Sequence, residues 1–316
     1  MRLWDRWVGV CTERETGETL AAFRILIGAV LLNDGIRTLL SGAVGPLFLP
    51  ESAGGLLRPR TLHWLVVALG GRETEVVTGL FGAAPLLALG LLLGVGGRWT
   101  ALLTLQVHLA LRSLSHHVSG GYDLVLSNGL WLLFLSSCTA TWSVDCRVRT
   151  GRWSSDRLVW ALPRTLLVLQ LVVIYTATGW GKRGFGWFWP YDGLHYSLLR
   201  VGYPRFDLGW LDAVPWATRL GTVVTWYWEA LFGVIGVWFA ARRGWLGARA
   251  DALARRFDLR GLWLGIGVAL HGGIWATMDI GPFSGATVAY YAAFVDPTEW
   301  RKLVQGFGTR RRSSEA

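Results

Sequence analysis

One lysine near the middle of the chain has the residue type and the neighbours that base chemistry requires. The sequence contains two lysines, Lys182 and Lys302, among 31 basic residues. Tyr175 and Thr178 precede Lys182 at spacings of seven and four residues, so a helix would place all three on one face. Lysine, unlike arginine, loses its proton when it is desolvated and can then act as a base. We therefore expect Lys182 to be a catalytic base in a pocket that Tyr175 and Thr178 line. The alternative is a lysine whose ammonium reaches the membrane interface.

A histidine further along the chain could form the opposite wall of such a pocket. His271, Trp275 and Asp279 follow one another at intervals of four residues, which predicts one stripe along a helix. Gly272 and Gly273 would let another helix or a flat ligand approach closely. The pattern predicts His271 as a second catalytic residue, with Trp275 and Asp279 in the pocket. Plain helix packing accounts for the same pattern equally well.

Further ionisable residues occur within apolar segments, where charges are costly and usually have partners. We expect Arg24, Asp34, Glu229 and His108 to be structural rather than catalytic. Glu229 is the deepest carboxylate and Arg24 lies at a similar depth, so these two are expected to form a buried pair. Asp34 and Arg37 are three residues apart on one predicted helix and are expected to pair with each other. His108 is expected to be a hydrogen-bonded core histidine rather than a ligand.

The elements that must position these residues are membrane-spanning helices. Of the 316 residues, 52% are hydrophobic and only 16% are charged, whereas about a quarter are charged in soluble domains. A span needs about 20 mostly apolar residues. The sequence predicts an all-α, polytopic bundle of eight transmembrane helices, over residues 19–40, 76–97, 99–111, 124–144, 165–181, 220–241, 261–278 and 280–295. The third would continue to about His117 if Arg112 reaches the interface, and residues 62–69 are expected to form a short interfacial helix.

The arginines between the predicted spans indicate the orientation of the chain in the membrane. The net charge is +10, and arginines cluster at residues 147–157, 242–256 and 310–312. The positive-inside rule places these segments, and with them both termini, in the cytoplasm of a protein integral to the cell membrane. We predict a single transmembrane domain over residues 1–300 and a basic cytoplasmic tail over residues 301–316. No segment is long enough to build a folded basic surface, so the lipid bilayer rather than nucleic acid is the expected partner.

Aromatic residues are concentrated in the predicted outer loop, residues 182–212. We expect Trp187 and Tyr196 to line the pocket as part of an aromatic lid, and a belt of aromatic side chains among the lipid headgroups is the alternative. The three cysteines, Cys11, Cys138 and Cys146, form no Cys-x-x-Cys pair. Neither a zinc site nor any other metal site is therefore expected.

Four stretches, in order along the chain, resemble the horizontally transferred transmembrane domain family, which is the membrane portion shared with the vitamin K-dependent γ-glutamyl carboxylases. They are Ala-Phe-Arg-Ile-Leu-Ile-Gly at residues 22–28, Gly-Gly-Tyr-Asp at residues 120–123, the run from Ile174 through Gly179 to Lys182 with Trp187 and Tyr196, and Leu-His-Gly-Gly-Ile at residues 270–274 with Gly-Pro-Phe-Ser at residues 281–284.

The resemblance implies that Lys182 is the base that deprotonates a quinone-type lipid in a pocket open to the outer face. In the carboxylases the oxygenated quinone then removes a γ-proton from a glutamate, and carbon dioxide adds. Their histidine near the fourth span has only His116 and His117 as nearby counterparts here. The chain also ends shortly after its last predicted span, without the large extramembrane domain that recruits the peptide.

We therefore expect a carboxylase-like protein or a quinol-dependent oxidoreductase rather than a peptide carboxylase. One alternative is a non-catalytic membrane protein that binds a lipid or a protein partner in the same cavity. Another is a transporter of small solutes. The sequence identifies no protein partner, and a shared fold does not fix a substrate.

Overall fold

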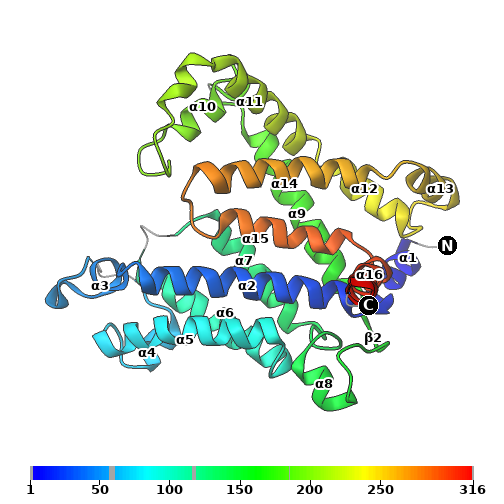
Figure 1. Ribbon diagram of the computed structural model, residues 1–316, viewed down its shortest axis with the longest axis horizontal. Coiled ribbons are helices and arrows are strands. Elements are labelled where there is room, and N and C mark those ends of the chain that lie inside the picture. Colours follow the sequence, from blue (N-terminus) through cyan, green and yellow to red (C-terminus); the bar gives the residue numbers. More distant parts are fainter. Residues whose placement is uncertain (1–2, 57–60, 116–118, 185, 315–316) are drawn as a thin grey trace. The chain divides into compact units, whose positions relative to one another are not determined.

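The computed structural model describes residues 3–56, 61–115, 119–184 and 186–314, and these residues are mostly helical (Figure 1). The all-α fold class is confirmed. The described residues include one small antiparallel sheet, formed by β1 (Arg14–Thr16) and β2 (Leu158–Trp160). The chain divides into two compact units, of which the first comprises Met1–Thr165 and Gly285–Ala316 and the second comprises Leu166–Ser284. His116 and His117 lie outside the described residues.

Four long helices with continuous apolar runs form the body of the first unit (Figure 1). α2 (Glu18–Leu40) packs against α5 (Thr74–Leu93), α5 against α6 (Gly97–Leu114), and α6 against α7 (Gly121–Phe134). Gly28 allows the close approach of α2 to α5, because a Cβ at this position would lie 2.7 Å from the backbone nitrogen of Leu92. The other helices of this unit are α1 (Leu3–Thr12), α3 (Val44–Phe48), η1 (Glu51–Ala53), α4 (Trp64–Ala68), α8 (Val144–Thr150), η3 (Tyr291–Phe294) and α16 (Pro297–Ser314).

In the sequence, the second unit begins within one helix and ends within another. α9 (Leu162–Gly181) leads into it and α15 (Phe283–Tyr290) leads out of it. Between them come α10 (Gly193–Leu198), η2 (Gly209–Ala213), α11 (Pro215–Ala230), α12 (Gly233–Arg242), α13 (Ala248–Arg256) and α14 (Leu259–Thr277). α11 packs against α10 and α14, and α12 packs against α13 and α14. The axes of α11 and α12 differ by 44° across a short break between them.

Among the described residues, three helices, α2, α5 and α9, are long and apolar enough to cross a membrane, and the bent pair α11–α12 would be a fourth. Large apolar side chains also point outward from these helices: Leu86 on α5 is 71% exposed and Val173 on α9 is 56% exposed. Such side chains are unfavourable in water and are covered by lipid in a bilayer. The fold is therefore compatible with a location in a membrane.

Several of the expected spans are interrupted. α7 ends at Phe134 instead of continuing to residue 144, and turns follow it, in which the Ser136 hydroxyl bonds to the Leu133 carbonyl. α5 ends at Leu93 because Gly94 adopts a left-handed φ of 70°. The segment 280–295 is α15 followed by the 3₁₀ helix η3 rather than one continuous helix. The short helix expected at residues 62–69 is present as α4.

Candidate functional site

The ammonium group of Lys182 is held by a carboxylate from another helix. Lys182 directly follows α9, and its backbone N–H donates to the Thr178 carbonyl at 3.1 Å, which continues the last helical turn. Its Nζ lies 2.5 Å from Oε2 of Glu229, in the last turn of α11. The Lys182 side chain is 24% exposed and the Glu229 side chain is 11% exposed. Both charges are thus largely removed from solvent, and each contacts its opposite.

Gly179 brings α9 close enough to α11 for this pair to form. A Cβ at position 179 would lie 2.3 Å from the backbone nitrogen of Ala230 and 2.6 Å from its Cα, so only glycine fits. Gly179 precedes Lys182 by three residues, and Ala230 directly follows Glu229. The contact between the two backbones therefore places the ammonium and the carboxylate at the same level.

Trp187 and Thr178 complete the surroundings of the ion pair. The Lys182 Nζ lies 4.4 Å from the centroid of the Trp187 ring, which is a cation–π contact. The Thr178 hydroxyl donates to the Tyr175 carbonyl at 3.0 Å and lies beside the Glu229 carboxylate. The ammonium is thus covered by an aromatic face on one side and by polar oxygen atoms on another.

A hydrogen bond between α9 and α14 forms the second half of the site. The hydroxyl of Tyr175 and Nε2 of His271 are 2.5 Å apart, and the two residues are only 5% and 3% exposed. The rings of Trp228 and Phe232 pack against Tyr175, with centroids 4.6 and 4.5 Å away. Tyr175 lies on the same face of α9 as Lys182, two helical turns earlier. The apolar rings exclude water, which strengthens this hydrogen bond.

Three residues expected in the pocket are largely exposed. Trp275 is 63% exposed and Tyr196, on α10, is 57% exposed. The Asp279 side chain is 49% exposed and lies 3.5 Å from the guanidinium of Arg205. The expected helical stripe does not reach Asp279, because α14 ends at Thr277. Of the stripe, only His271 turns into the core.

Arg24 is fully buried in the first unit and binds backbone carbonyls rather than a carboxylate. The acceptors are the carbonyl oxygens of Leu91 (2.5 Å), Leu92 (2.6 Å), Cys138 (3.1 Å) and Trp142 (2.6 Å). Leu91 and Leu92 belong to the last turn of α5, where carbonyls lack helical donors and carry partial negative charge. The expected pairing of Arg24 with Glu229 is therefore wrong: Arg24 closes the end of a helix, and Glu229 binds Lys182.

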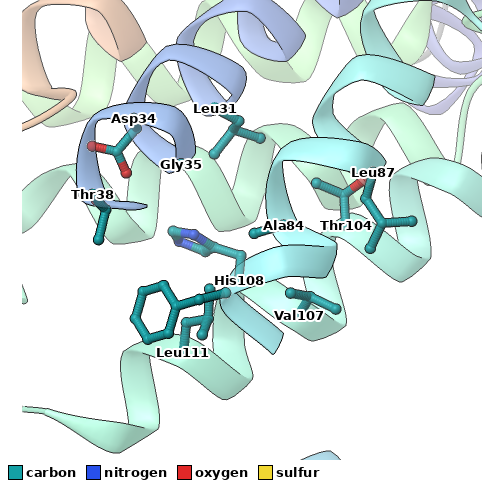
Figure 2. A pocket seen from close by; sticks show the side chains of 11 residues that line it. Leu31, Asp34, Gly35, Thr38, Ala84, Leu87, Thr104, Val107, His108 and Leu111 are labelled. Atoms are coloured by element: carbon teal, nitrogen blue, oxygen red, sulfur yellow. The ribbon is translucent and has the colours of Figure 1, made fainter. Parts of the chain in front are cut away.

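Asp34 and His108 line a small cavity within the first unit. The cavity has a volume of about 60 Å³, and in Figure 2 the His108 ring points toward the turn of α2 that carries Asp34 and Thr38. His108 Nε2 lies 3.6 Å from the Asp123 carboxylate, which is within ion-pair distance. Asp123 also contacts Arg112 at 3.3 Å. Asp34 and His108 thus belong to a polar cluster in the first unit. Lys182 and Glu229 belong to the second unit.

The sequence alone gave no indication of a second buried arginine, Arg164. Its guanidinium lies 2.8 Å from both Glu15 and Asp296 and donates to the Ala293 carbonyl at 2.7 Å. Arg164 directly precedes the predicted span at residues 165–181, so it resembles an ordinary flanking arginine. Its acidic partners are 149 and 132 residues away in sequence. The one sequence feature that could have identified Arg164 as a buried arginine is its position at the edge of an apolar run.

The chemistry open to the site is proton exchange among nitrogen and oxygen atoms. The described residues contain no group of three His, Cys, Asp or Glu side chains that could hold a metal ion. Cys11, Cys138 and Cys146 are free thiols. The Lys182 ammonium, the Glu229 carboxylate, the Tyr175 hydroxyl and the His271 imidazole are all groups that can accept or release protons.

Comparison with known proteins gives no match: no family model, no curated protein and no solved structure is significantly similar to this chain.

Proposed function

We propose that this chain is a polytopic membrane protein with eight transmembrane segments and both termini in the cytoplasm. The segments are α2, α5, α6, α7, α9, the bent pair α11–α12, α14, and α15 with η3. Three long apolar helices and the bent pair support the proposal, as does the clustering of arginines between segments. In this proposal the chain is related to the horizontally transferred transmembrane domain family that it resembles.

We further propose that Lys182 and Glu229 exchange a proton with a quinone-type lipid. The observation that carries the proposal is the 2.5 Å contact between Lys182 and Glu229 next to the Tyr175–His271 hydrogen bond. A short contact between an ammonium and a carboxylate in a poorly solvated site allows the proton to pass between them. In this proposal Lys182 gives its proton to Glu229, and the resulting amine is the base.

The proposed step is a simple proton transfer. A quinol hydroxyl gives its proton to the Lys182 amine, so the O–H bond breaks, an N–H bond forms, and the quinol becomes an anion while Lys182 becomes an ammonium. The Trp187 ring stabilises that ammonium, and Glu229 pairs with it again as a carboxylate once the proton that it took from Lys182 has left to solvent. Tyr175 and His271 hydrogen-bond to each other and form a second proton-exchanging pair in the same unit. Addition of carbon dioxide to a peptide is not part of this proposal.

The test is direct deprotonation of a soluble quinol by the purified protein in detergent. Quinol and quinol anion absorb at different wavelengths, so the fraction of anion is read from the ultraviolet spectrum of the bound molecule. The wild-type protein should raise the anion fraction, and Lys182→Met should abolish the rise. Arg183→Met is the matched control, because Arg183 is exposed and its guanidinium donates to the Trp180 carbonyl rather than to Glu229. An unchanged spectrum with Lys182→Met would reject Lys182 as the base.

A structural role for the ion pair is the second candidate. Glu229 and Trp187 already occupy two sides of the ammonium, an arrangement that would also suit a brace between α9 and α11 in a non-catalytic protein that binds a lipid or a protein. Lys182→Arg separates the two roles, because arginine keeps the positive charge but does not release its proton. A brace would tolerate this change, whereas a base would not.

A further inference from the structure

A second pocket lies at the beginning of α2 in the first unit. It has a volume of about 280 Å³ and is formed by the first residue of α2, the segment that follows α8, and α16. Its lining includes Glu18, Arg152, Ser154, Asp156 and Arg301. The pocket contains both acidic and basic side chains, which is unusual for a site that binds a simple anion or a simple cation.

Glu18 provides one pole of this pocket, which is its negatively charged binding group. Its side chain is 1% exposed, and Oε1 accepts hydrogen bonds from Nε and Nη2 of Arg301 at 2.9 and 2.5 Å. Oε2 is also buried but has no hydrogen-bond donor among the residues that the structure describes. A buried carboxylate oxygen without a donor is strongly unfavourable. The pocket therefore requires a donor from outside the chain, and a primary ammonium would supply one together with a positive charge.

Arg152 provides the other pole. Its side chain is exposed at the pocket, and its guanidinium makes no contact with an acceptor among the described residues. Arg301 is by contrast engaged, because Nη1 lies 2.7 Å from Asp156 while its other nitrogen atoms bind Glu18. An available guanidinium beside a serine hydroxyl is the arrangement that recognises phosphate. One pocket thus offers an acceptor for an ammonium and a donor for a phosphate.

The place of the pocket indicates where such a ligand comes from. Glu18 is the first residue of α2, a helix long and apolar enough to span a membrane. In the membrane arrangement proposed above, on which this inference rests, the pocket is therefore at the level where lipid headgroups meet the end of a span. We propose that this pocket binds the headgroup of a phospholipid with a primary amine, of the phosphatidylethanolamine class, with the amine on Glu18 and the phosphate on Arg152.

The experiment measures lipid retention by the purified full-length protein in native mass spectrometry. The delipidated protein receives phosphatidylethanolamine, phosphatidylcholine or phosphatidylglycerol, one at a time. Phosphatidylethanolamine should be retained about tenfold more strongly than phosphatidylcholine, the factor expected for one charge-assisted hydrogen bond, because a trimethylated amine has no N–H to donate. Phosphatidylglycerol, which has no cation, should also be retained weakly. Equal retention of the three lipids would overturn the proposal.

Two variants test the two poles separately. Glu18→Gln should remove the preference for phosphatidylethanolamine over phosphatidylcholine, and a preference that survives would contradict the role of Glu18. Arg152→Gln should weaken retention of all three phospholipids, whereas Arg157→Gln, in the same segment but outside the pocket, should not. Arg152 is exposed, so this arm does not depend on the stability of the core. Equal retention by the Arg152 and Arg157 variants would contradict the phosphate contact.

A last arm distinguishes a lipid from a soluble ligand of the same chemistry. Free phosphoethanolamine in excess should displace the lipid only weakly, because it lacks the acyl chains, whose burial adds to the affinity of the lipid. Displacement by free phosphoethanolamine at the same concentration as the lipid would assign the pocket to a soluble ligand and overturn the lipid assignment.

Discussion

Lys182 and Glu229 are 47 residues apart in sequence, yet Nζ of one lies 2.5 Å from Oε2 of the other. Lys182 directly follows α9 and Glu229 is the last residue but one of α11, so both are close to the point where the backbones of the two helices touch. The ion pair is thus a property of how two helices meet rather than of either helix alone.

Breaking this pair from one side should destabilise the protein. Glu229→Gln leaves the partly buried ammonium without its counter-charge, at a cost of about 2 kcal/mol, below the value for a fully buried pair because Lys182 is partly exposed. The double variant Lys182→Met with Glu229→Gln should recover part of that loss, since neither charge remains. A double-mutant cycle of unfolding in detergent measures the coupling. Strictly additive losses would show that the pair contributes nothing to stability.

Removing the hydroxyl of Tyr175 should weaken the contact between α9 and α14. Tyr175→Phe keeps the ring packing with Trp228 and Phe232 but loses the hydrogen bond to His271. The expected loss is about 1 kcal/mol or more in unfolding free energy. Tyr227→Phe on α11 is the control, because Tyr227 is 48% exposed and its change should be within about 0.5 kcal/mol. Similar losses in the two variants would argue against a special role for the Tyr175 hydroxyl.

A methyl group at Gly179 should push α9 away from α11. Gly179→Ala places a Cβ 2.3 Å from the Ala230 nitrogen, and overpacking of this kind costs about 1–3 kcal/mol or more. Gly181→Ala, two residues along the same helix, meets no atom within 4 Å and should be tolerated. Thermal unfolding in detergent compares the two. If both variants melt like the wild type, the backbones are not in contact.

Arg24 should not be replaceable even by lysine. An ammonium cannot reach the four carbonyl groups that the planar guanidinium binds, so Arg24→Lys is expected to cost about 3 kcal/mol or more. Arg37→Lys is the control on the same helix, because Arg37 is exposed. The measurement is the yield of folded, monodisperse protein for the two variants. Equal yields would show that the four carbonyl contacts of Arg24 do not stabilise the fold.

The start of α4 should respond to pH. Burial lowers the pKa of His63, and its Nδ1 accepts a hydrogen bond from the Leu65 N–H at 3.3 Å, which requires the neutral ring. Because the folded pKa is below the unfolded value of about 6.5, this contact is fully present above that pH and is lost as the pH falls through the lower, folded pKa. Hydrogen exchange of the Leu65 amide should become faster as the pH falls through the folded pKa of His63. An exchange rate that does not increase there would contradict the hydrogen bond between His63 and Leu65.

The residues that could do chemistry were recognisable from sequence, but their partners were not. Lys182, Tyr175 and Thr178 share a face because helical spacing alone determines it. The depth of Glu229 along its segment is also recognisable, but depth does not determine how a helix is rotated about its axis, so it predicts Arg24 rather than Lys182 as the partner of Glu229. The contact between Gly179 and Ala230 decides that rotation, and nothing in either segment alone reveals it.

The helices followed from the apolar runs, whereas their ends did not. Apolar residues continue past Phe134 and across the break between α11 and α12, so composition predicts longer spans than form. The end of α14 at Thr277 likewise removed Asp279 from the expected stripe. Interruptions inside apolar segments depend on turns and on distant partners, which short-range patterns do not encode.

The touching backbones of Gly179 and Ala230 also limit how a molecule could reach Lys182. Where two main chains are in direct contact, no side chains lie between them that could rearrange. The ends of α9 and α11 at this contact therefore move together. The ammonium cannot be uncovered by parting the two helices there. Its aromatic neighbour Trp187 belongs instead to the connection beyond α9, so displacement of that indole would widen the access that the 24% exposed Lys182 side chain already has.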